Sequence, residues 1–440
     1  MNRRQFSSLA LGAFAPPAKL PNIVWLTTED MGPQLGCYGF PLTRTPNLDR
    51  LAGEGMRFTR AFTTAPVCSA SRSAFNTGMY QTATGTHHHR SHRKDGYLLP
   101  AGVRLVSDHL RERGYFTCNV KTAAPGVTGT GKTDFNFTVQ RPYDGDHWGQ
   151  RRAGQPFFAH INFRESHKGP AFPEARKQKD LVDPAQVPLA PYWPDHPVVR
   201  DEFANYLDAI SLADIKIGKV LKRLEDEGLA GNTAVFMFGD NGRCLIRGKQ
   251  WLYDAGIHVP LIVRWPGGVT PGAVVEDPVS AIDITATTLW LAGVEIPRNM
   301  HGRPLFGPSA RPRDCVFAAR DRCDMTVDRI RAVRTKHYKY IRNFMPERPY
   351  TQYNEYIEKS YPTLGVMKTL HAEGKLSGAQ LLFIEARKPD EELYDVVADP
   401  HEVNNLAASP LHQPILKDLR ARLERWIEEI DDQGRIPEVG

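Results

Sequence analysis

The chain has 440 residues, of which 41% are hydrophobic and 24% are charged, values typical of globular proteins. This composition excludes a disordered chain, a collagen-like repeat and a coiled coil, and no stretch reaches the roughly 18 uninterrupted apolar residues of a membrane span. The formal net charge of +6 comes from a mild excess of Lys and Arg spread along the chain. Such an excess suits anionic substrates but does not indicate nucleic acid as a partner.

The N-terminus has the features of an export signal. Arg3 and Arg4 precede a short apolar stretch over residues 7–15, which ends in a small-x-small triplet. The adjacent arginines and Phe6 resemble a twin-arginine signal, which carries folded proteins across a bacterial membrane. We therefore expect residues 1–18 to direct export to the periplasm or the medium; a disordered terminus is the alternative.

The rest of the chain alternates between short apolar runs and helical periodicity, which predicts an α/β fold with helices on both faces of a sheet. The expected strands and helices cover residues 22–27, 45–55, 203–228, 234–238, 259–263 and 411–430. A Pro- and Gly-rich passage between Pro297 and Pro312 marks the expected domain boundary. We predict a catalytic domain over residues 19–310 and a smaller C-terminal subdomain over residues 311–440.

Two expected strands end in clusters of oxygen-bearing side chains. Glu29 and Asp30 follow the first strand, and Asp240 and Asn241 follow the strand over 234–238. If these strands are neighbours, three carboxylates and one amide meet at the sheet edge, where a divalent cation such as calcium relieves their repulsion. Turn chemistry is the alternative explanation for either pair alone, because Asp-Asn-Gly also forms good turns.

A third cluster begins at Cys68. Small and hydroxyl-bearing residues start a helix there, and Gly78 ends it. Arg72 lies four residues after Cys68 and therefore one turn away on the same helix face, where it can orient the side chain at 68 or bind an anion. A buried cysteine at a helix start is the alternative.

Cys-x-Ala-x-Arg from Cys68 to Arg72, followed by Thr77-Gly78, resembles the signature of the type I sulfatases, in which the cysteine is converted to formylglycine. Further matching segments span nearly the whole chain after the signal, at residues 21–30, 45–58, 114–115, 156–167, 240–263 and 392–406. The resemblance implies an alkaline-phosphatase-like fold, with a mixed sheet between helices and a smaller α+β unit that carries an antiparallel sheet. Within the family, the chain resembles bacterial heparan N-sulfatase-like members.

The resemblance also implies the chemistry. A formylglycine-generating maturation enzyme would convert Cys68, and the hydrated aldehyde would attack sulfur, leaving a sulfate ester that expels sulfate as the aldehyde forms again. Calcium would be held by Glu29, Asp30, Asp240 and Asn241, although the family usually has aspartate where Glu29 stands. Arg72 and Lys249 would neutralise charge on the sulfuryl oxygens, and His167 would lie close to the leaving oxygen.

The active-site lysine is ambiguous because the family's usual Gly-Lys-x-His is altered. Lys132 matches by its Gly-Lys context and Lys121 by its distance from Gly114-Tyr115; we favour Lys132, with Asp134 at the usual histidine position. A histidine could instead come from the run at residues 87–89 and His92, which is alternatively a solvated loop or an adventitious metal site.

Two further regions are candidates for contacts to the substrate. His88 and His89 resemble the histidine loop that borders the pocket in heparan N-sulfatases, and Arg322 belongs to an arginine-rich passage that could grip a second sulfate or a uronate. That passage is alternatively an exposed strand of alternating charge. We expect a sulfated carbohydrate, either a sulfate ester or a sulfamate on glucosamine, as the substrate.

Two other functions compete with this hypothesis. A phosphomonoester or phosphonate hydrolase of the same superfamily would share the metal loops, although such phosphatases generally have serine or threonine where Cys68 stands. A non-catalytic sulfoglycan-binding protein would leave Cys68 unconverted. The mass of the peptide that contains residue 68 separates the last possibility from the others.

Overall fold

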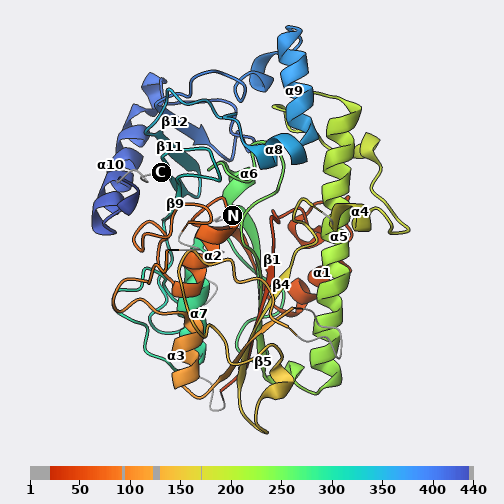
Figure 1. Cartoon of the computed structure of the whole chain (residues 1–440), viewed down its shortest axis with the longest axis vertical. Helices are drawn as coiled ribbons and strands as arrows, with labels where there is room; N and C mark the ends of the chain where they lie inside the picture. Colours follow the sequence, from red (N-terminus) through yellow and green to blue (C-terminus); the bar gives the residue numbers. More distant parts are fainter. Residues whose placement is uncertain (1–19, 92–94, 122–128, 170, 436–440) are drawn as a thin grey trace, which may run out of the picture.

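A mixed sheet with the strand order β3-β4-β1-β5-β6-β2-β7 forms the centre of the larger part of the molecule, and β8 pairs with β2 (Figure 1). The structure is a computed structural model that describes residues 20–91, 95–121, 129–169 and 171–435. The strands are β1 (Asn22–Thr28), β2 (Met56–Phe62), β3 (Phe116–Val120), β4 (Phe157–Phe163), β5 (Thr233–Gly239), β6 (His258–Arg264), β7 (Ala273–Val275) and β8 (Val279–Ser280). The four neighbours β3, β4, β1 and β5 run parallel, whereas β6 is antiparallel to both β5 and β2.

Helices cover both faces of this sheet, because alternate residues of each buried strand point to opposite sides. The helices of this part are α1 (Pro46–Glu54), α2 (Cys68–Thr77), α3 (Val106–Glu112), α4 (Ala171–Ala175), α5 (Pro197–Asp226), α6 (Asp254–Ile257) and α7 (Ile282–Leu291). Val24 and Leu26 of β1 belong to the apolar cluster that includes α1 and α5. Ile23 and Trp25 belong to the cluster that includes α2, α3 and α7.

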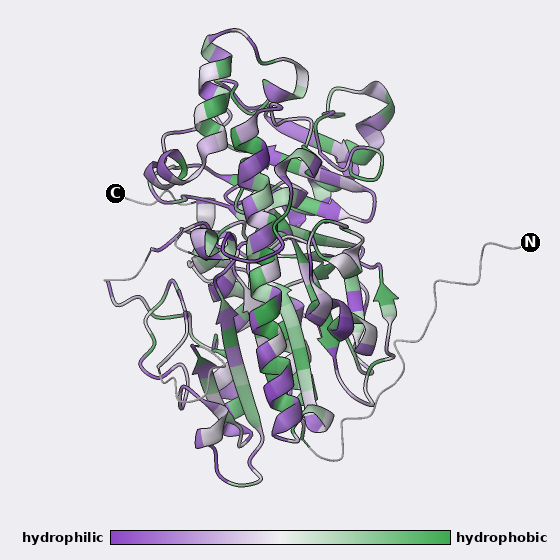
Figure 2. Ribbon diagram, turned by 90° about the vertical axis from the view of Figure 1, so that its right-hand side faces the viewer, coloured by the Kyte–Doolittle hydropathy of each residue, from purple (hydrophilic) through white to green (hydrophobic). Residues whose placement is uncertain are grey.

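Figure 2 shows the resulting hydropathy pattern, with mostly hydrophobic strands behind the alternating hydrophilic and hydrophobic bands of the long helix α5. The helix begins at Pro197, where the missing amide costs no hydrogen bond, and it ends just before Gly228, whose φ of +68° suits glycine. None of the helices in the described ranges is long and apolar enough to cross a membrane.

A second sheet, with the antiparallel order β12-β11-β10-β9, forms the smaller part of the molecule. The strands and helices of this smaller part are β9 (Cys315–Arg320), β10 (Ile330–Thr335), β11 (Tyr338–Asn343), α8 (Glu355–Ser360), α9 (Pro362–Ala372), β12 (Glu391–Asp395) and α10 (Gln413–Glu429). Leu416, Leu419 and Leu423 on one face of α10 pack in a cluster with Val333 and Tyr340 of the sheet.

The predicted fold class is therefore confirmed: a mixed sheet lies between helices, and a separate antiparallel sheet follows it. The expected strands and helices all form, with bounds that differ by a few residues. The division at residue 310 remains a prediction, and it falls in the connection between α7 and β9. The expected export signal over residues 1–18 lies outside the described residues.

Candidate active site

Pairing of β1 with β5 brings the two strand-end clusters together, because parallel neighbours end at the same edge of a sheet. Thr28 pairs with Gly239 at the last step of the ladder. Beyond it, the amide of Asp30 donates to Oδ1 of Asp240 at 3.0 Å, and Asn241 Nδ2 donates to Oδ1 of Asp30 at 2.9 Å. Asp30, Asp240 and Asn241 are completely buried.

The backbone at Asp30 adopts a left-handed conformation, with a φ of +54°. Aspartate tolerates this region better than most residues because its short polar side chain can bond nearby backbone groups. The turn at residues 29–30, directly after β1, directs consecutive side chains to different partners. Glu29 and Asp30 consequently face two different parts of the site.

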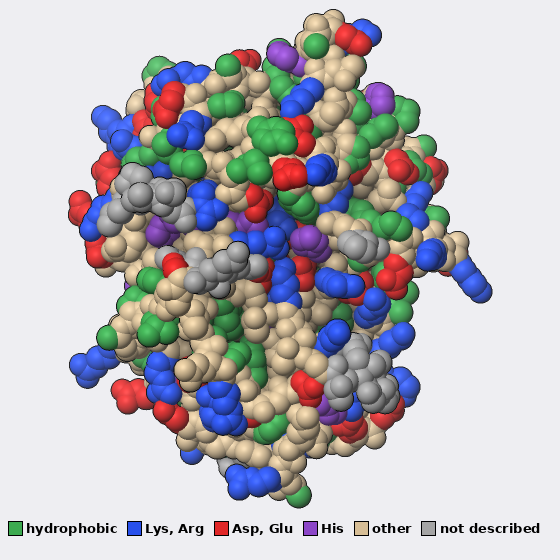
Figure 3. All heavy atoms as spheres, in the orientation of Figure 1, with side chains coloured by type: hydrophobic (Ala, Val, Ile, Leu, Met, Phe, Trp, Pro, Cys, Tyr) green, Lys and Arg blue, Asp and Glu red, His purple; other side chains and the backbone are tan. Residues whose placement is uncertain are grey.

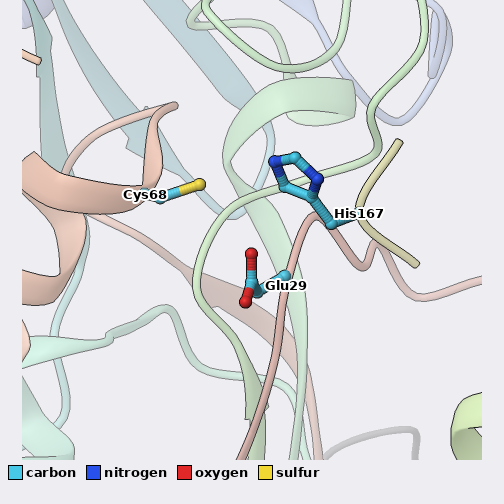
Figure 4. Close-up of side chains that lie close together, drawn as sticks. All are labelled: Glu29, Cys68 and His167. Carbon is cyan, nitrogen blue, oxygen red and sulfur yellow. The ribbon is translucent and has the colours of Figure 1, made fainter. Parts of the chain in front are cut away.

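Glu29 occupies a neighbouring position rather than joining the Asp30–Asp240 contact. Its carboxylate accepts hydrogen bonds from Lys132 Nζ at 2.7 Å and from Asn162 Nδ2 at 2.6 Å. One oxygen of Glu29, the sulfur of Cys68 and one ring nitrogen of His167 lie within 4.8 Å of one another. The Cys68 sulfur points toward the space between Glu29 and His167 (Figure 4).

Cys68 is the first residue of α2 and is completely buried. Its sulfur lies 3.6 Å from Oδ1 of Asp30 and 3.3 Å from Nζ of Lys249. Sulfur and one carboxylate oxygen each of Asp30 and Asp240 also lie within 4.8 Å of one another. Burial raises the pKa of the Cys68 thiol to about 11, so the unmodified side chain is a protonated thiol at neutral pH.

Arg72 lies one turn further along α2, as its spacing predicts, and its guanidinium is completely buried. Nε donates to Oδ2 of Asp240 at 3.0 Å, and Nη2 donates to Oδ1 of Asn162. Through these bonds Arg72 holds the side chains of Asp240 and of Asn162, and Asn162 in turn bonds Glu29. Nη1 is buried and has no hydrogen-bond partner among the described residues.

Lys249 and His167 complete the wall of the site around Asp30. Nζ of Lys249 donates to Oδ2 of Asp30 at 2.9 Å, and Nε2 of His167 lies 3.9 Å from the same oxygen. Burial would lower the pKa of Lys249, but the charge of Asp30 raises it well above its usual value. Burial, assisted by the charge of Lys249, lowers the pKa of His167 to about 4, so this imidazole is neutral at neutral pH.

The two candidate lysines occupy different places. Lys132 reaches the site, where it bonds Glu29 and lies 3.3 Å from Oδ2 of Asp134. Lys121, directly after β3, is exposed and lines the same cleft as Glu29, Lys132 and His167, but it is Lys132 that bonds Glu29. The φ of Asp134 is +55°.

His87 and His89 are buried and His88 is half-buried, and this loop contacts the start of the smaller part of the molecule. Nδ1 of His89 lies 2.8 Å from Oδ1 of Asp324, and the His89 amide donates to the carbonyl of Arg322 at 2.9 Å. The Arg322 amide in turn donates to Nδ1 of His88 at 3.2 Å. All three substrate-binding candidates therefore lie together, whereas His92 lies outside the described residues.

Sequence reasoning did not assign three further residues of this region. Asn162 bridges Glu29 and Arg72, and a polar residue at the end of a buried strand is a signal that could have revealed it. Asp324 pairs with His89, and the Tyr356 ring lies 5.6 Å from Nζ of Lys249. No local pattern connects Asp324 and Tyr356 with β1, because loop paths determine these contacts.

The donor set has the chemistry of a calcium site. Burial would raise the pKa of Glu29 and of Asp30, but the neighbouring lysines lower both to about 2, so these side chains are carboxylates at neutral pH. Oδ1 of Asn241 is buried and has no hydrogen-bond donor among the described residues. An unpaired amide oxygen beside Asp30 and Asp240 is the kind of oxygen ligand that calcium takes, so the residues present fit this cation.

Two family models and several known proteins match this chain. The sulfatase family model matches residues 21–294, and a model described as N-sulphoglucosamine sulphohydrolase, C-terminal, matches residues 245–360. The chain is 34% identical to an ulvan-active sulfatase of Formosa agariphila, over 95% of this chain and 76% of that protein.

A second relative and a solved structure cover the chain almost completely. The chain is 27% identical to human N-sulphoglucosamine sulphohydrolase, over 94% of this chain and 91% of the relative. A structure solved in complex with its substrate D-glucosamine-2-N,6-O-disulfate aligns with a TM-score of 0.65 and 19% identity, over 94% of this chain and 99% of that one. The family model covers more than half of the chain, from β1 to the residues after α7, and includes the whole strand-end site. The chain therefore belongs to the sulfatase family.

Proposed function

We propose that this sulfatase hydrolyses a sulfate ester or a sulfamate on a carbohydrate, with formylglycine at position 68 and a bound calcium ion. The observation that carries the proposal is the position of Cys68, at the first turn of α2 and within 3.6 Å of Asp30. Relatives named for ulvan and for N-sulphoglucosamine support a sulfated carbohydrate as the substrate. The sulfamate of glucosamine is the narrower form of the proposal.

Calcium would be held by Glu29, Asp30, Asp240 and Asn241, and when bound it would supply positive charge next to the reacting sulfuryl group. Arg72 holds Asp240 at 3.0 Å and so keeps one of these ligands in place. Lys132 does the same for Glu29 at 2.7 Å. Both cations also offset the repulsion between carboxylates at one sheet edge.

Conversion of Cys68 by a maturation enzyme would replace the thiol with an aldehyde whose hydrate offers a nucleophilic oxygen. Lys249, 3.3 Å from the sulfur that marks this position, would stabilise negative charge on the attacking group and on the sulfuryl oxygens. His167 lies across the space from Cys68 (Figure 4) and, as a neutral imidazole, can exchange a proton with the leaving oxygen.

We propose His88, His89 and Arg322 as the contacts to the carbohydrate. Burial lowers the pKa of His89 below its usual value, although the hydrogen bond to Asp324 opposes this shift. A neutral His89 held by Asp324 presents its other ring nitrogen in a fixed orientation. Tyr356 adds an aromatic face beside His167, with ring centres 6.1 Å apart.

We further propose that residues 1–18 direct export, so that the enzyme acts in the periplasm or outside the cell. A twin-arginine route would carry the chain after folding. Fusion of residues 1–18 to a reporter that matures only when it is exported folded tests this, and Arg3→Lys with Arg4→Lys should block export.

The experiment that tests the proposed function joins a mass measurement with an assay. Mass spectrometry of the tryptic peptide that contains residue 68 should show the loss expected when a thiol becomes an aldehyde. Purified enzyme should release sulfate from ulvan or from N-sulfoglucosamine. An unconverted cysteine in protein produced with its maturation enzyme would favour a non-catalytic binding protein, and hydrolysis of phosphonate esters without sulfate release would favour the phosphonate hydrolase.

A further inference from the structure

A second basic region lies beside the active site, over the ends of the next two strands of the sheet. A cleft of about 720 Å³ is lined at one end by Glu29, Lys132 and His167, which also belong to the active site. From there it extends past residues directly after β4 and β3 to one face of α5. The volume lies within the roughly 300–1,000 Å³ of pockets that bury small ligands.

The lining of this cleft is strongly cationic. Its charged residues are the carboxylates Glu29 and Glu165 and the cations Arg90, Lys121, Lys132, Arg164, Lys216 and Lys219. Figure 3 shows Lys and Arg side chains gathered near the centre of this face and toward the side where α5 lies in Figure 1.

Internal ion pairs neutralise only part of this charge. Lys132 bonds Glu29, and Nζ of Lys216 bonds Glu165 at 2.7 Å. Lys121, Arg164 and Lys219 are exposed in the cleft wall, and none has an ion-pair partner among the described residues. Three unpaired cations on three different elements, all facing one cleft, attract an anion from outside the protein.

We infer that this cleft binds a second anionic group, a sulfate or a carboxylate, on a carbohydrate unit next to the one whose sulfate is removed. This inference rests on the proposed function. The active site lies at the ends of β1 and β5, and the cleft lies over β4 and β3, which follow in the sheet order. A polyanionic chain with one sulfate at Cys68 would therefore pass Lys132 and reach Arg164, Lys219 and Lys121. Arg164 offers the paired donors that match a planar carboxylate or a sulfate edge.

Cleft variants test the inference in a protein that cannot turn over. In a Cys68→Ala background, Arg164→Gln with Lys219→Gln should weaken binding of ulvan or heparin oligosaccharides by about tenfold, because charge-assisted hydrogen bonds are lost. Lys417→Gln is the matched control, since Lys417 is an exposed lysine on α10, on the other side of the molecule from α5 in Figure 1. The binding constants are measured by calorimetry at a fixed ionic strength, because surface charge is screened by salt.

The same pair of substitutions in the active enzyme gives a second measurement. The ratio of kcat/KM for ulvan oligosaccharides to kcat/KM for 4-nitrophenyl sulfate should fall, through a higher KM for the oligosaccharide. Unchanged binding in the double variant, an equal loss for both substrates, or equally tight binding of single-stranded DNA would each overturn the inference. If the parent enzyme released no sulfate from any substrate, the proposed function would fail, while the binding comparison would still decide whether the cleft holds anions.

Discussion

Asp30 and Asp240 follow two neighbouring parallel strands, and the amide of Asp30 donates to the carboxylate of Asp240 at 3.0 Å. This hydrogen bond links the two acidic loops directly, so a displacement of one loop also displaces its partner in the other. Lys249 on one side and Arg72 on the other then compensate their charge. The site is thus a buried network in which acids and cations alternate, and removal of one member leaves an uncompensated charge.

The first prediction concerns the converted residue. Cys68→Ala should reduce sulfate release by at least about a thousandfold, because the proposed nucleophile is lost, while the fold is kept. Turnover and the thermal midpoint are measured on the same preparation. Cys68→Ser should be active only when produced with a maturation enzyme that converts serine. Full activity of the alanine variant would exclude formylglycine chemistry at this position.

The second prediction concerns calcium. Chelation should lower both activity and thermal stability, and added calcium should restore them, because a ligand at a hundred times its Kd stabilises the folded state by about 2.7 kcal/mol. Magnesium should substitute poorly because it demands a stricter shell and dehydrates reluctantly. Asp240→Asn should lose the stabilisation by calcium in differential scanning fluorimetry. Equal calcium affinity in Asp240→Asn and the parent would show that the cation binds elsewhere.

The third prediction separates the two candidate lysines. Lys132→Met should reduce kcat by about 10²–10³-fold on a small aryl sulfate, because Glu29 loses its partner and the site loses a positive charge. Lys121→Met should leave kcat on the same aryl sulfate nearly unchanged, since Lys132, and not Lys121, bonds Glu29. Steady-state kinetics of both variants provide the comparison, and the reverse order of effects would identify Lys121 as the active-site lysine.

The fourth prediction concerns the histidine loop and pH. Burial would raise the pKa of Asp324, but the hydrogen bond with His89 lowers it to about 2, so the pair keeps a charged carboxylate beside His89. His88→Ala and His89→Ala should each change the pH dependence of kcat/KM on a sulfated monosaccharide. His337→Ala is the control, because His337 is exposed in the smaller part of the molecule. Superposable profiles for all three variants and the parent would remove the loop from substrate recognition.

The fifth prediction concerns stability in acid. His160 is buried between Thr27 and Tyr143, and burial, assisted by the charge of Arg72, lowers its pKa to about 3. Only the unfolded chain takes up a proton on this imidazole near pH 6.5. The contribution of His160 to the free energy of unfolding is therefore complete above pH 6.5 and is lost as the pH falls. By pH 4.5 this one group lowers the free energy of unfolding by about 3 kcal/mol.

Urea unfolding of His160→Gln at pH 7 and at pH 4.5 checks this expectation. At pH 7 the free energy of unfolding of the variant should be lower than that of the parent, because one buried hydrogen bond is broken. Between pH 7 and pH 4.5, however, the free energy of unfolding should fall by less in the variant than in the parent. His258 and His301, whose pKa values burial also lowers to about 4, should leave part of the acid sensitivity in place. His337→Gln is the exposed control, and an equal acid loss in His160→Gln and the parent would contradict the assignment.

Much of the site could be predicted because its residues follow regular elements. A buried apolar strand predicts where its carboxyl end lies, so Asp30 and Asp240 could be expected at one edge once β1 and β5 were assumed to be neighbours. The spacing of Cys68 and Arg72 likewise follows from the helical repeat, and Gly78, with a φ of +70°, ends that helix as its type predicts.

The tertiary structure alone decided the contacts made by long side chains from irregular segments. The Gly-Lys context favoured Lys132 over Lys121, but only the tertiary structure shows that Lys132 bonds Glu29. The same holds for Asp324, which reaches His89 from 235 positions away. Loop paths depend on packing against distant parts of the chain, and local propensity does not encode them. The amino-acid sequence by itself therefore determined the strand-end acids and the signature helix, whereas the cleft over β3 and β4 arises only because cationic residues after β3, after β4 and on α5 meet in the tertiary structure.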